Sequence, residues 1–335
     1  MYKYILKRLL LMIPTMFFVM ILVFTINYFS EGDPVSDILG PEATQEQYDQ
    51  KREELGLNDP YHEQLFRYVK NIVTEFDFGT SYKTGKPVIE EVLERFPTTL
   101  LLTLCSMAIA TVLGVLLGVI SAVKQYSVLD YLATLTSLVG VSIPSFWLGL
   151  MLMLVFALQL GWFPASGFYG PKYWVLPAIA IAVIPLSTIT RMTRSAMLEV
   201  VRQDYMRTAK AKGLSETQTI LKHGLKNTLI PVITVIGIQT GRTLAGSIVV
   251  ESIFSIPGLG SLIVNAINAR NYPTIQGSIL FCALTFCIIN LLVDILYAYI
   301  DPRIKSQYIR PRVRRQVLEQ KIAGAVSDGN GKGEA

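Results

Sequence analysis

The sequence has few of the residues that build metal centres and disulfide frameworks. Its 335 residues include only three cysteines and two histidines. Cys105, Cys282 and Cys287 all lie inside apolar segments, and their spacing fits neither a zinc site nor a redox pair. His62 and His223 are far apart and have no neighbours that would complete a metal site. We therefore expect no metal site, no cofactor bound to this chain and no disulfide framework.

Charged residues are also scarce, and long apolar runs take their place. Only 16% of the residues are charged and 51% are hydrophobic, whereas a soluble domain of this size has about 25% charged residues. The composition therefore predicts an all-α integral membrane protein whose surroundings are the lipid bilayer.

Catalytic motifs are missing as well. Residues 79–86 resemble a phosphate-binding loop, but five residues separate the two glycines where four are needed. Pro87 also occupies the position at which Ser or Thr would bind Mg²⁺. The sequence has no nucleophile elbow, no HExxH motif and no paired-carboxylate constellation. We therefore expect no catalytic residues and no ATP hydrolysis by this chain.

Six apolar segments have the length needed to cross a bilayer as helices. They are Leu9–Phe29, Thr98–Val123, Tyr131–Leu160, Trp174–Ile189, Leu229–Val250 and Thr274–Ile300. The first is longer than the apolar region of a signal peptide and no cleavage site follows it, so we interpret it as a span. The third is interrupted by Ser142-Ile143-Pro144-Ser145.

Charge differs sharply between the two long polar segments. Residues 30–96 contain 15 acidic and 7 basic residues, a net charge of −8. Residues 191–227 contain 8 basic and 3 acidic residues, a net charge of +5. Because basic residues collect in cytoplasmic loops, we expect the second segment and both termini in the cytoplasm, and the first segment outside.

These features divide the sequence into four parts. Residues 1–30 hold the N-terminal start and the first span. Residues 31–96 form an extracytoplasmic helical cap, with helices expected at 44–55 and 61–76. Residues 97–300 form a transmembrane core of five helices that includes a cytoplasmic loop at 191–228. Residues 301–335 are a basic cytoplasmic tail, expected to be disordered towards its end.

The polar stretch Glu199–Pro231 has the sequence features of two short helices joined at a glycine. Gly213 follows good helix formers and stands where a left-handed C-terminal residue belongs. Ser215 to Gln218 fit a capping box that starts a second helix, on which Leu214, Leu221 and Leu225 share one face. A DNA-binding helix-turn-helix is excluded because membrane segments flank the pair, so no nucleic acid is expected. An ordinary amphipathic loop and a docking element for a soluble partner both remain open.

Ionisable residues in or near the spans are candidates for a translocation pathway, because such groups are costly in lipid and face the bundle interior or water. Arg242 is the deepest, Glu251 lies near the outer end of its span, and Asp294 lies near an inner end. Glu251 at the interface and Asp294 paired with a basic loop are the alternatives. Ser142 and Pro144, in the interruption of the third span, complete the candidate set.

Residues Arg207–Pro231 resemble the EAA loop of ABC importer permeases, in the form typical of the dipeptide/oligopeptide/nickel family, first-subunit type. Arg207-Thr208-Ala209 stand in place of Glu-Ala-Ala, and Gly213 follows at the family's spacing. Other matching blocks occur in the family's order. They are Leu55–Gln64, Phe76–Tyr82, Pro87–Thr103, Ser142–Gly149, Gly241–Gly260 and Tyr297–Lys305.

The resemblance implies the six-helix type I permease fold of ABC importers in the prokaryotic cytoplasmic membrane, with the cap inserted between helices 1 and 2. It implies a heterodimer with a second homologous permease, two ATP-binding subunits that carry ATP and Mg²⁺, and an extracytoplasmic solute-binding protein. The residues implied to couple the chain to the ATPases are Arg207, Thr208, Ala209, Lys212, Gly213, Leu214, Ser215 and Glu216.

Three functions remain open at this point. The resemblance favours a permease for di- or oligopeptides. A nickel or other small-solute permease of the same family differs mainly in its binding protein. An ion-coupled secondary carrier would also use an intramembrane charge, but it would not need the cytoplasmic helix pair.

Overall fold

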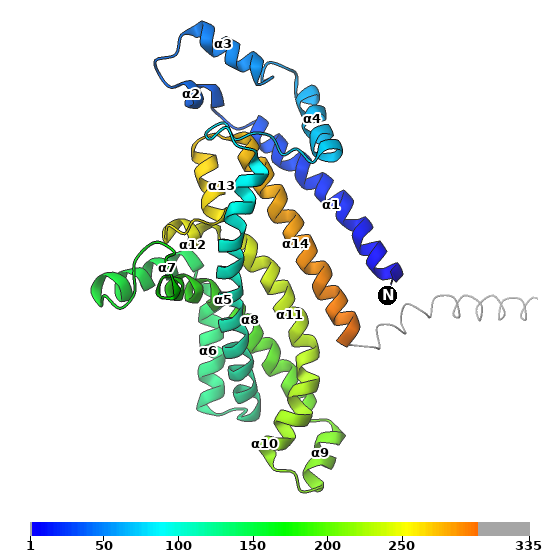
Figure 1. Ribbon diagram of the computed structural model, residues 1–335. Helices are drawn as coiled ribbons and strands as arrows, with labels where there is room; N and C mark the ends of the chain where they lie inside the picture. The colour runs from blue at the N-terminus through cyan, green and yellow to red at the C-terminus, as the bar shows by residue number, and fades with distance from the viewer. Residues whose placement is uncertain (1, 301–335) are drawn as a thin grey trace, which may run out of the picture.

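The chain folds as a bundle of long helices with a smaller helical cap at one end (Figure 1). The structure is a computed structural model and describes residues 2–300. The predicted tail at 301–335 lies outside the described residues. Five helices of the described part are long and apolar enough to cross a membrane, and a sixth span exists if one bent helix pair is counted as a single span. The prediction of an all-α membrane protein is confirmed.

Five long helices build the bundle. They are α1 (Tyr2–Tyr28), α5 (Val88–Val123), α8 (Pro171–Val201), α11 (Leu225–Gly246) and α14 (Tyr272–Ile300). The pair α5 and α8 packs closely because α5 has buried glycines at the contact. A Cβ on Gly118 would lie 2.5 Å from the Cβ of Thr193, and one on Gly114 would lie 2.9 Å from Cγ2 of Ile189. Small residues thus let the two backbones approach, as in other membrane helix pairs.

The predicted third span is two helices rather than one. α6 (Val128–Ser142) ends at the predicted interruption, and α7 (Ser145–Leu152) continues as the π-helical segment η2 (Met153–Gln159) at an angle of 103°. Ile143 and Pro144 are extended, and Pro144 fixes its own φ at −62°. The predicted interruption is present, and the sharp angle arises because α7 turns to pack against α8 and Phe254.

Two predicted boundaries were also wrong. α5 begins at Val88 and includes Pro97 in its interior, whereas the sequence suggested a start after this proline. Proline removes one helical hydrogen bond, which a long helix in a bundle tolerates. α8 extends to Val201, so Arg191 and Arg194 belong to a helix and not to the polar loop.

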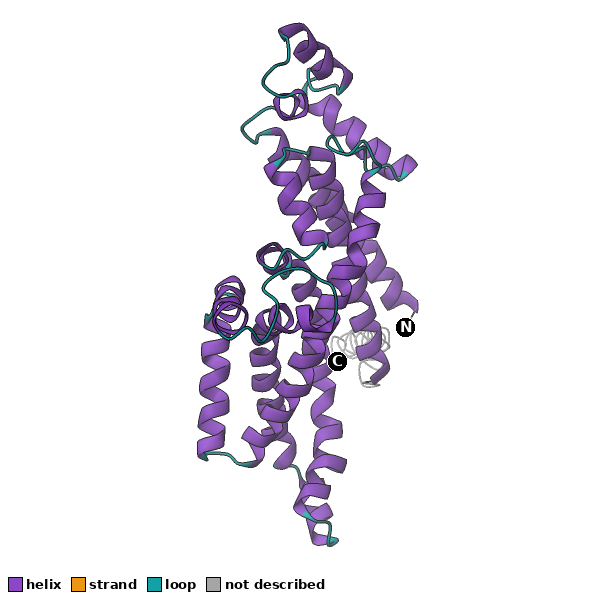
Figure 2. Cartoon of the chain, turned by 60° about the vertical axis from the view of Figure 1, so that its left-hand side comes forward, coloured by secondary structure: helices purple, strands orange, loops and turns teal. Residues whose placement is uncertain are grey.

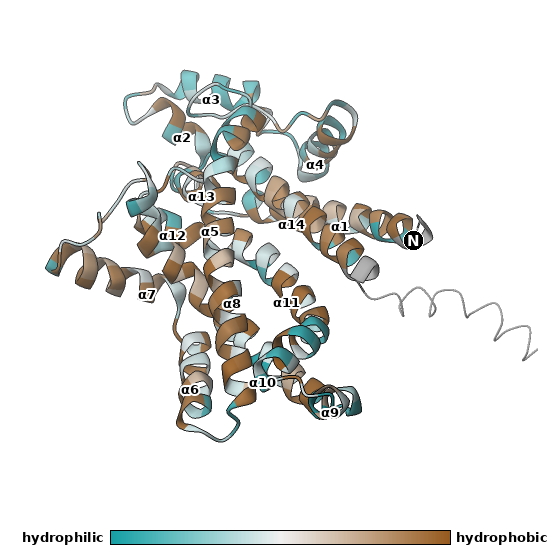
Figure 3. Ribbon diagram, turned by 60° about the horizontal axis from the view of Figure 1, so that its bottom comes forward, coloured by the Kyte–Doolittle hydropathy of each residue, from teal (hydrophilic) through white to brown (hydrophobic). Residues whose placement is uncertain are grey.

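The cap consists of α2 (Pro34–Leu39), α3 (Gln45–Glu54), α4 (Tyr61–Lys70) and the π-helical turn η1 (Asn71–Glu75). The helices expected at 44–55 and 61–76 are present, and Thr44 forms a full capping box with Gln47 at the start of α3. Hydrophilic residues concentrate in the cap and in the helices at the opposite end, while the long helices between them are mainly hydrophobic (Figure 3).

The remaining helices connect the long ones, as Figure 2 shows for the whole described chain. α12 (Ile248–Ile253) and α13 (Leu259–Asn268) lie between α11 and α14 on the cap's side of the bundle (Figure 1). α9 (Asp204–Ala211), α10 (Glu216–Gln218) and the π-helical segment η3 (Thr219–Gly224) lie at the end opposite the cap.

Candidate coupling site and translocation residues

The turn between α9 and α10 is the one expected from Gly213. Gly213 has φ of +85°, a conformation that costs other residues energy. Its amide donates to the carbonyl of Lys210 at 3.0 Å, and the amide of Leu214 donates to the carbonyl of Ala209 at 3.4 Å. These two bonds form a Schellman motif, which ends a helix by satisfying its last carbonyls. Local sequence therefore determines where α9 stops.

Ser215 starts the next helix, and this helix does not stop before the membrane. The amide of Gln218 donates to Oγ of Ser215 at 3.3 Å, so one half of the predicted capping box forms. From Glu216 the chain stays helical through α10, η3 and α11 to Gly246, a single helix of 31 residues. The second helix of the pair is thus the end of a membrane span, and it moves with that span.

The helix pair packs onto the ends of α5 and α8 through a small apolar cluster. Ala122, Met197 and Ile220 are its buried members. Met206 of α9 is 2% exposed, and a Cβ on Gly224 would lie 3.3 Å from Sδ of Met197 and from the terminal methyl of Met206. Asn227 of α11 donates from Nδ2 to the hydroxyl of Tyr205 on α9 at 3.0 Å. These contacts fix both helices of the pair to α8 and α11.

Most of the residues expected to couple to an ATPase lie on the open side of the pair. The exposed ones are Arg207, Thr208, Lys212, Gly213, Ser215 and Glu216, and Leu214 is half-buried. Ala209 is 7% exposed and faces the chain itself, so its small side chain serves packing within the chain. Leu221 is 56% exposed, so it lies on the open side of the second helix.

A hollow of about 260 Å³ separates the exposed edge of the pair from the bundle. It is lined by Ala122, Val123, Val201, Met206, Arg207, Lys210, Glu216 and Ile220. Nζ of Lys210 lies 3.4 Å from Oε1 of Glu216 across the turn. Both side chains are exposed, so this ion pair contributes little to stability.

An ion pair that the sequence did not reveal lies beside this site. Arg194 of α8 donates to both carboxylate oxygens of Asp130 on α6, at 2.7 and 2.9 Å. Asp130 also accepts from the hydroxyl of Ser121 and from the amide of Tyr126. Sequence reasoning missed this pair because Asp130 and Arg194 belong to different segments, and the available signal was a lone carboxylate at the start of an apolar segment.

Glu251 is buried within the chain and does not line an open path. Its side chain is fully buried. One carboxylate oxygen accepts from the hydroxyl of Ser247 at 2.9 Å, and the other accepts from the amide of Gly260 at 2.7 Å. The amide of Leu259 donates to Oγ1 of Thr99 at 2.8 Å. Glu251 and Thr99 thus satisfy the free amides at the start of α13.

The glycines around α13 allow this arrangement. A Cβ on Gly258 would lie 2.3 Å from Oε2 of Glu251, and a Cβ on Gly260 would lie 2.4 Å from Cα of Ile248. Larger residues at either position would push α12 and α13 apart. The glycines of the Ile256–Gly260 segment therefore allow α12 and α13 to pack closely.

Arg242 lies on an open stripe of α11. Ile238, Arg242 and Ala245 are exposed in the single chain and follow one helical face. An arginine in a span does not face lipid acyl chains without large cost. The stripe therefore faces either water or a second protein chain.

Ser142 and Pro144 are exposed at the junction of α6 and α7. The hydroxyl of Ser142 donates to the carbonyl of Leu138 at 2.9 Å, which is the usual local bond of a serine in a helix. Asp294 pairs with Arg8 of α1 at 3.1 Å, so its basic partner is in a helix and not in a loop.

The cap is held to the bundle by three consecutive residues at the junction of α13 and α14, the last of which begins α14. Nη1 of Arg270 contacts Oδ2 of Asp37 at 2.9 Å. Asn271 accepts from the amide of Tyr82 at 3.0 Å and donates to Oγ of Ser81 at 2.8 Å. We call Arg270, Asn271 and Tyr272 the cap joint.

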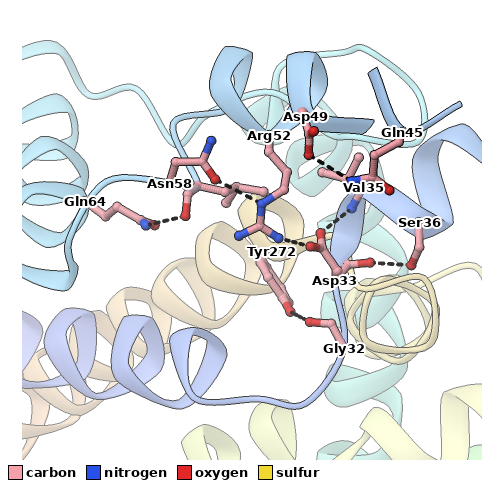
Figure 4. A network of polar contacts seen from close by, with 11 residues as sticks. Gly32, Asp33, Val35, Ser36, Gln45, Asp49, Arg52, Asn58, Gln64 and Tyr272 are labelled. Carbon is pink, nitrogen blue, oxygen red and sulfur yellow. Dashed lines mark hydrogen bonds and ion pairs between the residues drawn. The ribbon is translucent and has the colours of Figure 1, made fainter. Parts of the chain in front are cut away.

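Tyr272 connects the cap joint to a polar network in the cap (Figure 4). Its hydroxyl donates to the carbonyl of Gly32 at 3.3 Å. The next residue, Asp33, accepts from the amide of Val35 at 2.9 Å and pairs with Arg52 of α3. The cap joint therefore reaches both ends of the cap segment and makes it continuous with α14.

Comparison with known proteins identifies relatives over nearly the whole chain. A family described as binding-protein-dependent transport system inner membrane component matches residues 114–306, and a family for the N-terminal part of such components matches residues 1–103. The chain is 45% identical over 333 residues to the dipeptide transport system permease protein DppB of Alkalihalophilus pseudofirmus, covering 91% of this chain and all of that protein. It is 44% identical over 305 residues to the glutathione transport system permease protein GsiC of Salmonella paratyphi A, covering 91% and 99%.

The fold has a solved counterpart. The inward-facing MetNI methionine ABC transporter contains a chain that matches with a TM-score of 0.54 and 17% identity, covering 64% of this chain and 97% of that chain. At this identity the similarity establishes the fold alone, which is that of an ABC importer permease.

Proposed function

Because the chain belongs to the family of binding-protein-dependent transport system inner membrane components, we propose that it forms half of the translocation pathway of an ATP-driven importer for di- or oligopeptides. Membership makes it a multi-pass permease subunit of an ABC importer in the inner membrane, working with ATPase and substrate-binding proteins. Permease subunits are not enzymes, and an ion-coupled carrier is not supported.

A peptide substrate is supported by the names of two relatives. One relative is a dipeptide permease and the other a glutathione permease, at 45% and 44% identity over nearly their full lengths. Both solutes are short peptides. No comparable observation favours nickel, although the same scaffold would suit it.

We propose that a second, homologous permease covers the open stripe of α11. Arg242 lies on this stripe among apolar residues, and a charged side chain in that position needs a polar or aqueous partner across the interface. Arg242 would then face the pathway between the two permeases. Ser142 and Pro144, exposed at the α6–α7 junction, are further candidates for that surface.

We also propose that the exposed side of the α9–α10 turn docks into an ATPase subunit. Arg207, Lys212, Gly213 and Glu216 are exposed there, and Leu221 adds an apolar contact. ATP and Mg²⁺ would be held by the ATPases and not by this chain. This arrangement puts the pair in the cytoplasm and the cap outside, in agreement with the charge of the two segments.

Uptake by the reconstituted transporter tests the substrate. The complete transporter is reconstituted in liposomes with ATP inside. It consists of this chain, its partner permease, the two ATPase subunits and the binding protein. We expect uptake of a labelled dipeptide that depends on ATP and is reduced by unlabelled dipeptide. ATP-dependent uptake of Ni²⁺ that peptides do not reduce would reject the peptide assignment and retain the importer.

A further inference from the structure

The cap segment α4–η1 runs antiparallel along the cap-proximal half of α1. Tyr61, at its start, contacts the ring of Tyr28 with centroids 5.1 Å apart, and its hydroxyl lies 2.8 Å from Oγ1 of Thr25. Tyr68 stacks on Phe24 at 5.4 Å. As the cap segment advances, its contacts therefore move back along α1 towards the middle of the membrane span.

The contact continues well inside the span. Ile72 of η1 shares a buried cluster with Met20 of α1 and Leu280 of α14. Met20 lies eight residues before the end of α1 at Tyr28, and Leu280 lies eight residues after the start of α14 at Tyr272. At 1.5 Å per residue, each distance is roughly 12 Å along the helix. The contacts with α1 and with α14 therefore both show that η1 packs inside the cap-side ends of these two helices.

One flank of α4–η1 is apolar but is not covered by α1. Phe66, Val73 and Phe76 are 70%, 61% and 78% exposed. Phe66 and Val73 are seven residues apart and lie on one helical face, beside the half-buried Val69. We call Phe66, Val73 and Phe76 the open flank. The apolar sector of this segment is wider than its contact with α1.

α1 itself also has an exposed apolar surface. On α1 the side chains of Phe18, Leu22 and Ile26 are 65%, 44% and 60% exposed. α1 has no Gly, Ala or Ser, and the open flank has none either. Membrane helix pairs use such small residues for close approach, so bulky side chains without them favour lipid over a second helix.

Charged residues limit how deep the segment sits. Arg67 lies on the other flank of α4 and pairs with Asp59 at 2.6 Å, and Glu63 is exposed three residues before Phe66. Lys70 is exposed between the two flanks, and Glu75 and Asp77 are exposed on either side of Phe76. A helix with an apolar flank and charged residues at its margin lies at the boundary between headgroups and acyl chains, where charges remain hydrated.

We propose that the open flank of α4–η1 is a lipid-contacting surface that seats this part of the cap in the membrane leaflet on the cap's side. The occupant is the bilayer itself, and the partner permease is the competing occupant. The contact does not depend on which solute is carried. Only its assignment to the outer leaflet rests on the orientation proposed above.

Environment-sensitive labels on single cysteines test this proposal in the complete transporter. The three native cysteines are first replaced by serine. Phe66→Cys, Val73→Cys and Phe76→Cys are labelled with a fluorophore in liposomes that contain spin-labelled acyl chains. Arg67→Cys, on the other flank of the same helix, and Gln50→Cys, exposed on α3, are the matched controls. Iodide in the outside buffer reports access to water.

We expect blue-shifted emission and strong quenching by the spin-labelled lipid at the open flank, and quenching by iodide at the two controls. Iodide quenching at the open flank equal to that at Gln50 would overturn the proposal, because the flank would then face water. Protection from both quenchers would also overturn it, because a protein would then cover the flank. Uptake by the same liposomes is recorded in parallel, so failure of peptide transport would be seen separately.

Discussion

The carboxylate of Asp130 on α6 accepts from Nε and Nη2 of Arg194 on α8, at 2.7 and 2.9 Å. Asp130 is 3% exposed, and its other contacts come from Ser121 and Tyr126 at the end of α5 and the turn that follows. One carboxylate thus joins three elements next to the cluster on which the helix pair packs. The rigidity of the coupling end depends on this ion pair.

Replacing Asp130 by alanine should destabilise this end of the bundle. The guanidinium of Arg194 would lose its partner, at a cost of about 2 kcal/mol. We expect a lower midpoint of thermal inactivation for the assembled transporter and weaker retention of the ATPases. Arg191→Ala, on the same helix but exposed, is the matched control and should behave as the parent. Equal midpoints for the two variants would show that the ion pair is not structural.

Gly213→Glu should abolish ATP-driven uptake while the protein stays in the membrane. Its φ of +85° costs an L-residue about 1–2 kcal/mol, and a charged side chain would project from the exposed turn. Nothing lies within 4 Å of a Cβ at this position, so the loss would not come from a clash inside the chain. Gly213→Asn is the control, because asparagine tolerates this conformation. Normal uptake by the glutamate variant would argue against docking at this turn.

Arg242→Ala should change transport without releasing the ATPases. If Arg242 makes one charge-assisted hydrogen bond to the solute, its loss of about 1.5 kcal/mol corresponds to about a tenfold change in uptake rate or apparent KM. Arg242→Lys retains the charge and should lie between the two. Uptake and substrate range identical to the parent would remove Arg242 from the pathway.

Glu251→Ala should destabilise the junction of α12 and α13. It would leave the amides of Gly260 and Ser261 without acceptors in a buried place, at a cost of about 3 kcal/mol. Glu251→Gln keeps one acceptor oxygen and should be milder. The yield of assembled transporter and its thermal inactivation measure both variants. A glutamine variant that transports normally would also show that the charge of Glu251 is not needed for passage of the solute.

Asn271→Ala should loosen the cap at its joint. The amide of Tyr82 and the hydroxyl of Ser81 would each lose a partner, at a cost of about 2 kcal/mol together. We expect faster proteolysis in the segment between η1 and α5 and reduced stimulation of ATP hydrolysis by the binding protein. Asn265→Ala, an asparagine on α13 for which no side-chain bond to the cap exists among the described residues, is the control. Unchanged cleavage would indicate that the remaining contacts suffice.

Local features of this protein could be predicted from sequence, because they depend on a few neighbouring residues. The stop of α9 follows from Gly213, the start of the next helix from Ser215, and the interruption of the third apolar segment from Pro144. The helices of the cap are predicted by N-cap residues such as Thr44 and by the helical spacing of apolar residues. The length of the apolar segments gave the number of spans, and the resemblance carried by blocks in a fixed order implied the fold.

Contacts between distant segments could not be predicted in this way. Asp130 and Arg194 are 64 residues apart. Each is a charged residue of a type common in turns and loops, and nothing in either local sequence indicates the other. Glu251 stands in an apolar segment, and its charge suggested a pathway residue. Its partners include backbone amides, which every residue except proline has, so no sequence pattern indicates them. The 103° angle between α6 and α7 depends on packing against α8 and Phe254, and no local pattern encodes it.

The unbroken helix from Glu216 to Gly246 fixes an angular relation between its two ends. Successive residues are turned by about 100° in its α-helical part and by less in the π-helical segment η3, so the direction in which Leu221 points determines the direction of Arg242. The helix can therefore transmit rotation about its own axis as well as displacement. Inserting one alanine after Lys226 would leave both ends of the helix chemically intact and rotate one end relative to the other. The rotational alignment of the two ends is therefore a separate requirement for transport.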